Sequence, residues 1–149
     1  MKCLSGRQPW WWAILEAGKR IENRVWNTSY RGPILLHAAK GCTVDEYEDA
    51  LVWMENKGLI DHVRDAPPLK AMQRGGIVGR ARIAAVLPPH RFVCNHVISD
   101  LHGADTRWHM PEQYGFVLVD VEPLPFTPMK GALGLFEVPE PARPSVDGR

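Results

Sequence analysis

A short apolar segment followed directly by a charged one constrains the fold of this chain most. The apolar segment, residues 9–17, begins with Pro9 and is followed by Gly18. Proline suits the first turn of a helix and glycine often ends one, so this segment is predicted to be a helix. The side chains at 21–26 then alternate in character, as they do along a strand. The pattern therefore predicts a helix that turns at once into a strand.

The predicted strand 21–26 carries an unusual row of side chains on one face. Alternation places Glu22, Arg24 and Trp26 together there, and Lys19 lies in the turn that precedes them. A carboxylate, a guanidinium and an indole in one row suit a cleft that holds an anionic, aromatic ligand such as a nucleotide. The alternative is that Glu22 and Arg24 form a structural ion pair, because structural pairs perturb charges as active sites do.

The three consecutive tryptophans of the predicted helix cannot all face the core, because successive helical residues point about 100° apart. Trp10 is expected in the core, on one stripe with Ile14. Trp11 or Trp12 is then expected to cover a neighbouring strand. The alternative is that one of the three is exposed as a platform on which a base stacks.

A second helix is predicted over residues 43–57. Thr43 and Glu46 match a capping box, and the apolar stripe behind them ends before Gly58. Residues 59–74, with two prolines and many charges, are predicted to be a loop with at most one or two helical turns. Apolar or alternating runs predict strands over 34–38, 76–87, 114–121 and 133–138.

These elements place the chain in the α+β class, with five or six mostly antiparallel strands and two or three peripheral helices. Glycines inside strands often mark bends, and those in 76–87 and at Gly115 suggest a small curved sheet. With 149 residues, 45% of them hydrophobic, the chain suits one domain, predicted over 1–138. The proline-rich residues 139–149 are predicted to be a flexible tail.

Charge and cysteine content narrow the functional classes. The formal net charge is +1, so a nucleic-acid binder of this composition needs its basic residues gathered on one face. No run of about 18 apolar residues is present and the first residues lack a secretory signal, so no membrane association is expected. The three cysteines are odd in number and scattered, which argues against a disulfide framework and for a reducing compartment. A cytoplasmic protein is expected.

The segment 88–112 contains a cysteine and several histidines, among them Cys94, His96, His102 and His109, without the paired spacing of a zinc site. No metal and no other cofactor is expected. The glycines in 75–79 open a strand rather than a helix, so they do not form a phosphate loop. His37 lies in the buried run 34–38, where a core histidine is more common than a catalytic one.

The chain resembles the ASCH (activating-signal-cointegrator homology) domain family, a branch of the PUA-like superfamily. The family pattern has an early strand, a helix opened by Gln-Pro-Trp, and then glycine, lysine, glutamate and arginine at set spacings. Here it is carried by Leu4-Ser5, Gln8-Pro9-Trp10, Lys19, Glu22 and Arg24, and later by Gly75–Gly79, Tyr114–Leu118, Lys130-Gly131 and Gly134–Val138. Ala17 stands where the family has its glycine. The resemblance covers nearly the whole chain and implies a small PUA-like β-barrel.

The resemblance implies a binding module first, because the family is associated with RNA-linked and coactivator roles. RNA, or a single nucleotide or nucleoside, is then the expected partner of a basic, aromatic cleft. Basic residues would meet phosphates or a sugar, and Trp26 or Tyr114 would stack on a base. The candidate ligand-binding residues are Gln8, Trp10, Lys19, Glu22, Arg24, Trp26, Arg31, His37, Lys40, Tyr114 and Lys130.

The alternative is a small hydrolase. Bacterial members of the resembled superfamily include an amidohydrolase that removes the acetyl group from N4-acetylcytidine, and ribonuclease activity is attributed to other members. In the amidohydrolase a lysine of the equivalent motif acts with a threonine and a glutamate; Lys19 matches the lysine, and Glu22 stands in place of the threonine. Under this hypothesis Lys19 and Glu22 activate a water and Arg24 stabilises the developing oxyanion.

Overall fold

The chain folds around one strongly curved sheet. The structure is a computed structural model, which describes residues 1–90 and 102–139. The strands are β1 (Lys2–Gly6), β2 (Ile21–Arg24), β3 (Gly32–Ala38), β4 (Gly76–Leu87), β5 (Tyr114–Pro128) and β6 (Leu135–Glu137). The helices are α1 (Trp10–Glu16), α2 (Val44–Asn56) and α3 (Ile60–Val63), with 3-10 turns η1 (Leu69–Ala71) and η2 (Thr106–Trp108).

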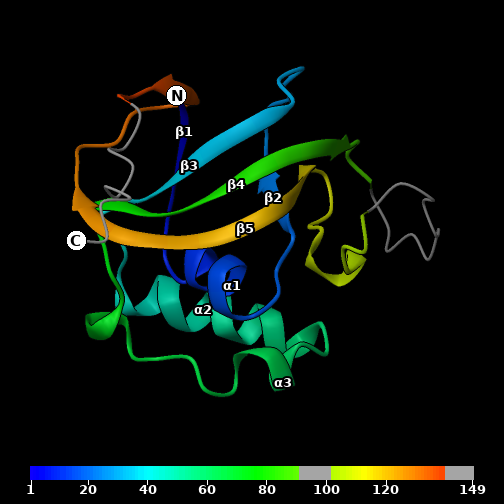
Figure 1. The fold of residues 1–149 in the computed structure, drawn as a ribbon. Helices are drawn as coiled ribbons and strands as arrows, with labels where there is room; N and C mark the ends of the chain where they lie inside the picture. Colours follow the sequence, from blue (N-terminus) through cyan, green and yellow to red (C-terminus); the bar gives the residue numbers. More distant parts are fainter. Residues whose placement is uncertain (91–101, 140–149) are drawn as a thin grey trace, which may run out of the picture.

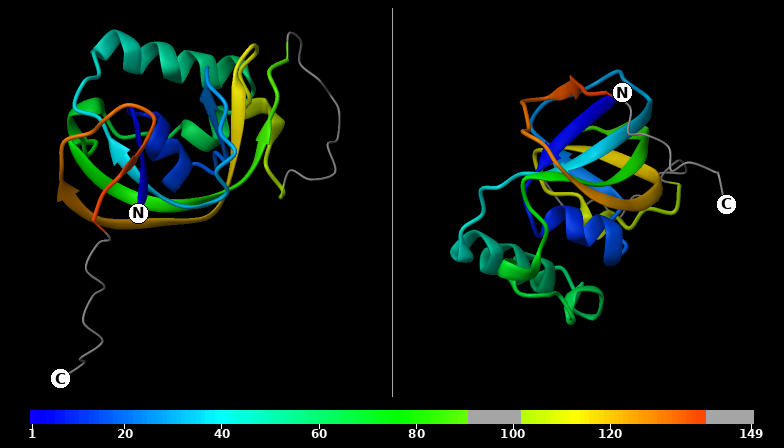
Figure 2. Two further views of the ribbon diagram at one scale, coloured as in Figure 1. Left: turned by 90° about the horizontal axis from the view of Figure 1, so that it is seen from above. Right: turned by 60° about the vertical axis from the view of Figure 1, so that its left-hand side comes forward.

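The strand order is β2-β5-β4-β3-β1-β6, and each neighbouring pair is antiparallel except β1 with β3. The sheet curls into a half-barrel, with α1, α2 and α3 on one side of it (Figure 1). Two further views show how the long strands β4 and β5 bend together (Figure 2). The prediction of an α+β fold with a small, mostly antiparallel PUA-like sheet is confirmed.

Irregular pairing and close strand approach accompany the curl. The β4–β5 ladder shifts register three times, and the β3–β4 ladder shifts once, between Leu36 and His37. Each shift inserts an irregularity that bends and twists a strand. Gly79 is needed for the approach of β5, because a Cβ there would lie 2.8 Å from the carbonyl oxygen of Glu122.

Trp11, and not Trp10, is the tryptophan of α1 that packs in the core. Its indole is fully buried, and Nε1 donates a hydrogen bond of 2.6 Å to the carbonyl of His37. Gly6 makes room for the ring, since a Cβ there would lie 2.5 Å from Cε2 of Trp11. Trp10 is half-buried and packs edge-on against Trp53. The expectation that Trp10 occupies the core is therefore wrong, because the carbonyl acceptor and the space beside Gly6 favour Trp11.

The second helix, α2, begins where the capping pattern predicts. Thr43 is its N-cap, and the side chain accepts a hydrogen bond from the backbone N–H of Glu46. In a capping box the Glu46 side chain would in turn accept a hydrogen bond from the backbone N–H of Thr43. Here the Glu46 carboxylate pairs instead with Arg7 at 2.6 Å. Residues 59–74 contain only α3 and η1, as the prediction of a loop with one or two helical turns requires.

Parts of two sequence expectations lie outside the described residues. They are residues 140–149 of the predicted tail and the pair Cys94 and His96. Within residues 1–90 and 102–139, no cluster of His, Cys, Asp and Glu side chains is placed to hold a metal ion. In those same residues no helix has the length and apolar character needed to cross a membrane.

Candidate functional site

A cleft of about 550 Å³ opens beside the junction of α1 and β2. Its walls come from distant parts of the chain: the end of β1, the first turn of α1, β2 with the residues after it, and the loop 132–134. Most of its charged and aromatic lining is supplied by Arg7, Trp10, Lys19, Glu22, Arg24 and Trp26. Four of these six side chains belong to the eight residues 19–26, which run from the turn after α1 through β2.

Lys19 and Glu22 form a buried ion pair in this cleft. The Lys19 side chain is 1% exposed, and its Nζ lies 3.0 Å from Oε2 of Glu22. The ammonium also lies 5.1 Å from the ring of Trp10, within cation–π range. Burial lowers the pKa of Lys19 below its usual value, and the Glu22 carboxylate offsets part of this lowering. Lys19 is therefore a hydrogen-bond donor that loses its proton more readily than an exposed lysine.

Arg24 lies on the other side of Glu22 and completes the row. Its Nε lies 3.4 Å from Oε1 of Glu22, and its Nη2 donates a 2.7 Å hydrogen bond to the carbonyl of Ser5. Nε is buried and has no hydrogen-bond partner among the described residues, so this donor stays unsatisfied. One carboxylate between two cations gives the row a net positive charge.

Two tryptophans line the cleft beside this charged row. Trp26 is half-buried, and its ring lies edge-to-face with Phe116 at a centroid distance of 5.2 Å. Trp10 is held in the same way by Trp53, at 5.8 Å. These contacts fix each indole while part of it still lines the cleft. Aromatic walls beside a cationic row suit a planar ligand that carries negative charge.

Asn23 attaches a distant loop to the cleft. Its Nδ2 donates to the carbonyl of Trp108 at 2.9 Å, and its Oδ1 accepts from the backbone N–H of Met110 at 2.8 Å. Met110 thereby becomes part of the cleft lining. Strand alternation predicts that Asn23 lies on the face opposite Glu22, and no local pattern signals this long-range role.

His37 lies behind the cleft and is not part of its lining. Its Nε2 lies 2.7 Å from the carbonyl oxygen of Met129, and its Nδ1 lies 2.8 Å from Oγ of Ser5. A carbonyl can only accept, so in the neutral ring Nε2 carries the proton and Nδ1 accepts from the Ser5 hydroxyl. Ser5 lines the cleft, so His37 orients a cleft residue from behind.

Three residues expected in the same pocket do not line the cleft: Gln8, Tyr114 and Lys130. Gln8 is buried, and its Nε2 donates to the carbonyl of Gln73 at 3.0 Å. Tyr114 is half-buried opposite Arg24 in the β2–β5 ladder, and Lys130 is exposed. The expectation that these three line the pocket is wrong, because motif spacing does not show where the curled sheet carries them.

Arg31 and Lys40 also lie outside the cleft. Arg31 donates hydrogen bonds to backbone carbonyls of its own loop. Lys40 directly follows Ala39, which lines the cleft. Of the eleven candidates, the structure brings together Trp10, Lys19, Glu22, Arg24 and Trp26. Sequence reasoning missed the cleft residues Ser5, Arg7 and Gln113. Ser5 lies in a segment that carries the family resemblance but was not chosen as a site residue, and Arg7 and Gln113 come from segments with no distinctive pattern.

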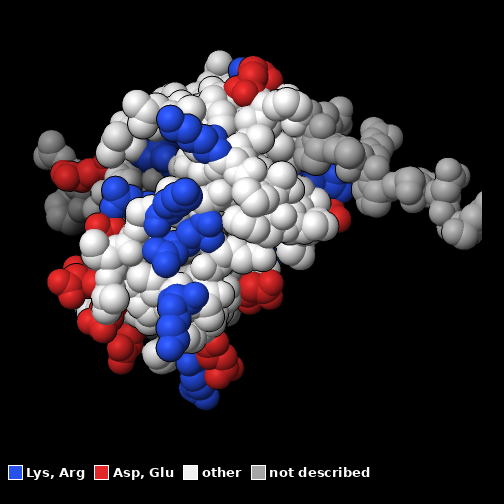
Figure 3. Space-filling view, turned by 90° about the vertical axis from the view of Figure 1, so that its left-hand side faces the viewer, with Lys and Arg blue, Asp and Glu red and all other residues white. Residues whose placement is uncertain are grey.

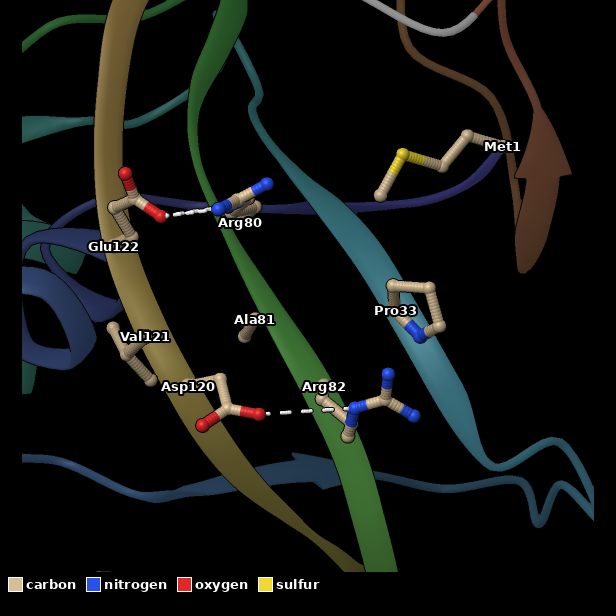
Figure 4. A pocket seen from close by; sticks show the side chains of 8 residues that line it. All are labelled: Met1, Pro33, Arg80, Ala81, Arg82, Asp120, Val121 and Glu122. Atoms are coloured by element: carbon tan, nitrogen blue, oxygen red, sulfur yellow. Dashed lines mark hydrogen bonds and ion pairs between the residues drawn. The ribbon is translucent and has the colours of Figure 1, made fainter.

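A second, open cavity of about 510 Å³ lies over β3, β4 and β5 (Figure 4). Two ion pairs border it: Arg80 with Glu122 at 2.6 Å, and Arg82 with Asp120 at 3.7 Å. Each cation there already has a carboxylate partner, so the charges are compensated within the cavity. The cleft at α1 and β2, with its surplus cation, is the better candidate for an anionic ligand.

Comparison with known protein families finds a match. A family model described as the ASCH domain matches residues 4–125, which is well over half of the sequence. The match runs from β1 into β5 and includes Lys19, Glu22 and Arg24 of the cleft. ASCH domains are generally RNA-binding modules of the PUA-like type. No curated protein matches the chain.

Proposed function

We propose that this chain, which belongs to the ASCH domain family, binds single-stranded RNA and takes one nucleotide into the cleft between Trp10 and Trp26. The observation that carries the proposal is the row Lys19–Glu22–Arg24, in which two cations flank one carboxylate beside two indoles. The family match supports RNA as the ligand class, and the row supports the cleft as the place where it binds.

The size of the cleft agrees with such a ligand. Pockets for small molecules and cofactors commonly measure about 300–1,000 Å³, and this one is about 550 Å³. RNA-binding proteins read single strands by stacking splayed bases on aromatic side chains and by hydrogen bonds to the base edges. Trp26 is the stacking residue in this proposal. Lys19 and Arg24 donate to the base edge or the sugar, and Glu22 accepts.

Binding of a fluorescent single-stranded RNA to the wild type and to Trp26→Leu tests the proposal. Stacking of a base on an aromatic side chain contributes about 1–3 kcal/mol, so the variant is expected to bind about tenfold more weakly or worse. Trp12→Leu is the matched control, because Trp12 is also half-buried but does not line the cleft. Equal binding by the two variants would contradict the proposal.

A hydrolase that acts on a modified nucleoside is the second candidate. The observation that favours it is the lowered pKa of Lys19, which brings this amine closer to use as a base near neutral pH. In the hydrolysis of N4-acetylcytidine, Lys19 and Glu22 would take a proton from a water as it adds to the acetyl carbonyl. That proton would pass to the N4 nitrogen as the adduct collapses to acetate and cytidine. The Arg24 guanidinium, whose side chain is 19% exposed, would stabilise the oxyanion.

Chromatography of N4-acetylcytidine incubated with the protein separates the two candidates. Formation of cytidine that is abolished by Glu22→Gln, with substrate affinity retained, would establish the hydrolase. RNA binding by a wild type that forms no cytidine would favour the binding module. A thermal shift with each ligand provides the affinity measurement, because a ligand that binds only the folded state raises the melting temperature.

A further inference from the structure

Several cations of the described chain lack a carboxylate partner, and three of them meet at one place. Among residues 1–90 and 102–139, the lysines and arginines that form no ion pair are Arg20, Arg31, Lys40, Lys57, Lys70, Arg74 and Lys130. Arg20 and Arg31 bond to nearby carbonyls, and Lys57 lies over the ring of Trp53. Lys40, Arg74 and Lys130 instead belong to segments that meet at Gly75, and we call them the Gly75 strip.

Three segments far apart in the sequence converge on the Gly75 strip. Arg74 donates from Nη1 to the carbonyl of Lys40 at 3.2 Å. The Lys40 side chain crosses Gly75 so closely that a Cβ on this glycine would lie 2.9 Å from its Cγ. The carbonyl of Gly75 accepts from the backbone N–H of Met129 at 3.1 Å, which places Lys130 next in line. These contacts bring the segments that carry the three cations together at Gly75.

The Gly75 strip is continuous with the cleft on two sides. Lys40 follows Ala39, which lines the cleft and whose N–H bonds to the carbonyl of Gly6 at 2.9 Å. Lys130 lies two residues before Ala132, the start of the loop 132–134 that also lines the cleft. A ligand that fills the cleft and extends beyond this loop therefore reaches the strip.

The distribution of charged side chains on this surface supports a path from the cleft to the Gly75 strip. Figure 3 shows this end of the sheet, where Lys and Arg side chains form a column and acidic side chains lie mainly at its margins. Lys40 and Lys130 are exposed and Arg74 is half-exposed. Long, exposed cations without carboxylate partners suit phosphates, because such contacts position a nucleic-acid backbone without reading its sequence.

We propose that the Gly75 strip binds the phosphates of an RNA strand that leaves the cleft, so that the protein holds several consecutive nucleotides. The inference rests on the proposed function and deepens it: the ligand becomes a strand with a defined exit, and not an isolated nucleotide. The cleft holds one base, and Lys40, Arg74 and Lys130 neutralise phosphates beyond it.

The test compares uridine monophosphate with fluorescent oligouridylates of increasing length, each measured over a range of salt concentrations. The strip variant combines Lys40→Gln, Arg74→Gln and Lys130→Gln. The control variant combines Lys2→Gln, Lys57→Gln and Arg64→Gln, and it removes the same net charge from surface positions elsewhere. Circular dichroism verifies that both variants are folded.

The strip variant is expected to bind the monophosphate as the wild type does and the long oligomers about tenfold more weakly or worse. Its logarithmic salt slope should fall by about 0.7 for each phosphate that the strip no longer neutralises, the value for single strands. The control variant should follow the wild type at every length. The proposal would be overturned if the strip variant bound long oligomers as tightly as the wild type does. It would also be overturned if the strip and control variants lost affinity for them equally.

The cleft is tested separately in the same series. If Trp26→Leu weakens the binding of oligomers of every length while the strip variant binds normally, the cleft is supported as the nucleotide site and the proposal for the Gly75 strip is refuted. If Trp26→Leu has no effect while the strip variant binds the long oligomers weakly, the strip binds RNA phosphates, but the nucleotide pocket and the path of the strand out of it are refuted.

Discussion

Nζ of Lys19 lies 3.0 Å from Oε2 of Glu22, and the two side chains are only 1% and 9% exposed. The pair is not symmetrical. Glu22 has a second cation, Arg24, 3.4 Å from its other oxygen, whereas Glu22 is the only carboxylate paired with Lys19 in the described chain. A change at one end of the pair therefore differs in its consequences from a change at the other.

We expect Glu22→Gln to destabilise the fold more than Lys19→Met. The first change leaves a buried ammonium without a counter-charge, which costs about 3–5 kcal/mol when a buried pair is broken. The second leaves Glu22 with Arg24, so a cost of about 1–3 kcal/mol is expected. Urea unfolding of both variants measures the difference. Equal costs, or a larger cost for Lys19→Met, would contradict this account of the row.

Gly6→Ala should destabilise the protein by about 1–3 kcal/mol. The added methyl would meet Cε2 of Trp11 at 2.5 Å, in a core where the indole is fixed by its bond to His37. Gly41→Ala is the matched control, because its added methyl meets nothing within 4 Å. The control should be neutral or stabilising by up to about 1 kcal/mol. Denaturant midpoints measured with unchanged slopes test both, and a neutral Gly6→Ala would refute the packing argument.

Cys3 should resist alkylation in the folded protein. Its side chain is fully buried, and burial raises the pKa of the thiol from 9.0 to about 12, so at a given pH it holds about a thousandfold less thiolate. Site-resolved mass spectrometry after iodoacetamide treatment should show labelling of Cys3 only when denaturant is present. Cys42, which is half-exposed, serves as the internal reference for reagent access. Labelling of Cys3 as fast as Cys42 in the native state would be inconsistent with the β1 core.

Local features of the fold were accessible from the sequence, because caps and periodicity act over a few residues. Thr43 marks the start of α2, and the limits of β4 at 76 and 87 coincide with the predicted run. The choice between Trp10 and Trp11 was not accessible in this way. It depends on the carbonyl of His37 and on the space beside Gly6, and both are set by strand pairing across the sheet.

The candidate site likewise has a part that local sequence patterns predict and a part that depends on long-range contacts. Strand alternation and the short turn after α1 were enough to group Lys19, Glu22 and Arg24. The remaining walls depend on loops that long-range contacts bring in, such as the two hydrogen bonds by which Asn23 holds residues 108–110. The Gly75 strip is formed by three segments that meet only after the sheet has formed. The sequence therefore allowed Lys40 and Lys130 to be selected as basic candidate residues, but it did not show where in the fold they lie.

The stability of the protein should fall as the pH drops below about 6.5 because of His109. Burial lowers the pKa of this imidazole, and the neighbouring His90 lowers it further, although the bond from Nε2 to the carbonyl of Gln113 opposes the shift. The unfolded chain therefore takes up a proton on His109 at a higher pH than the folded chain does. Stability then increases with pH across the window from the folded pKa up to about 6.5 and is lost on acidification.

His109→Gln keeps an N–H donor for Gln113 and removes the titration. We expect the variant to lose less stability than the wild type between about pH 7 and about pH 5, measured as free energy of unfolding in urea. His62→Gln, at an exposed position on α3, controls for the loss of an imidazole as such. A wild type and a His109→Gln variant with parallel pH profiles would show that His109 is not the group that couples folding to protons. The acid sensitivity would then have to arise from another group.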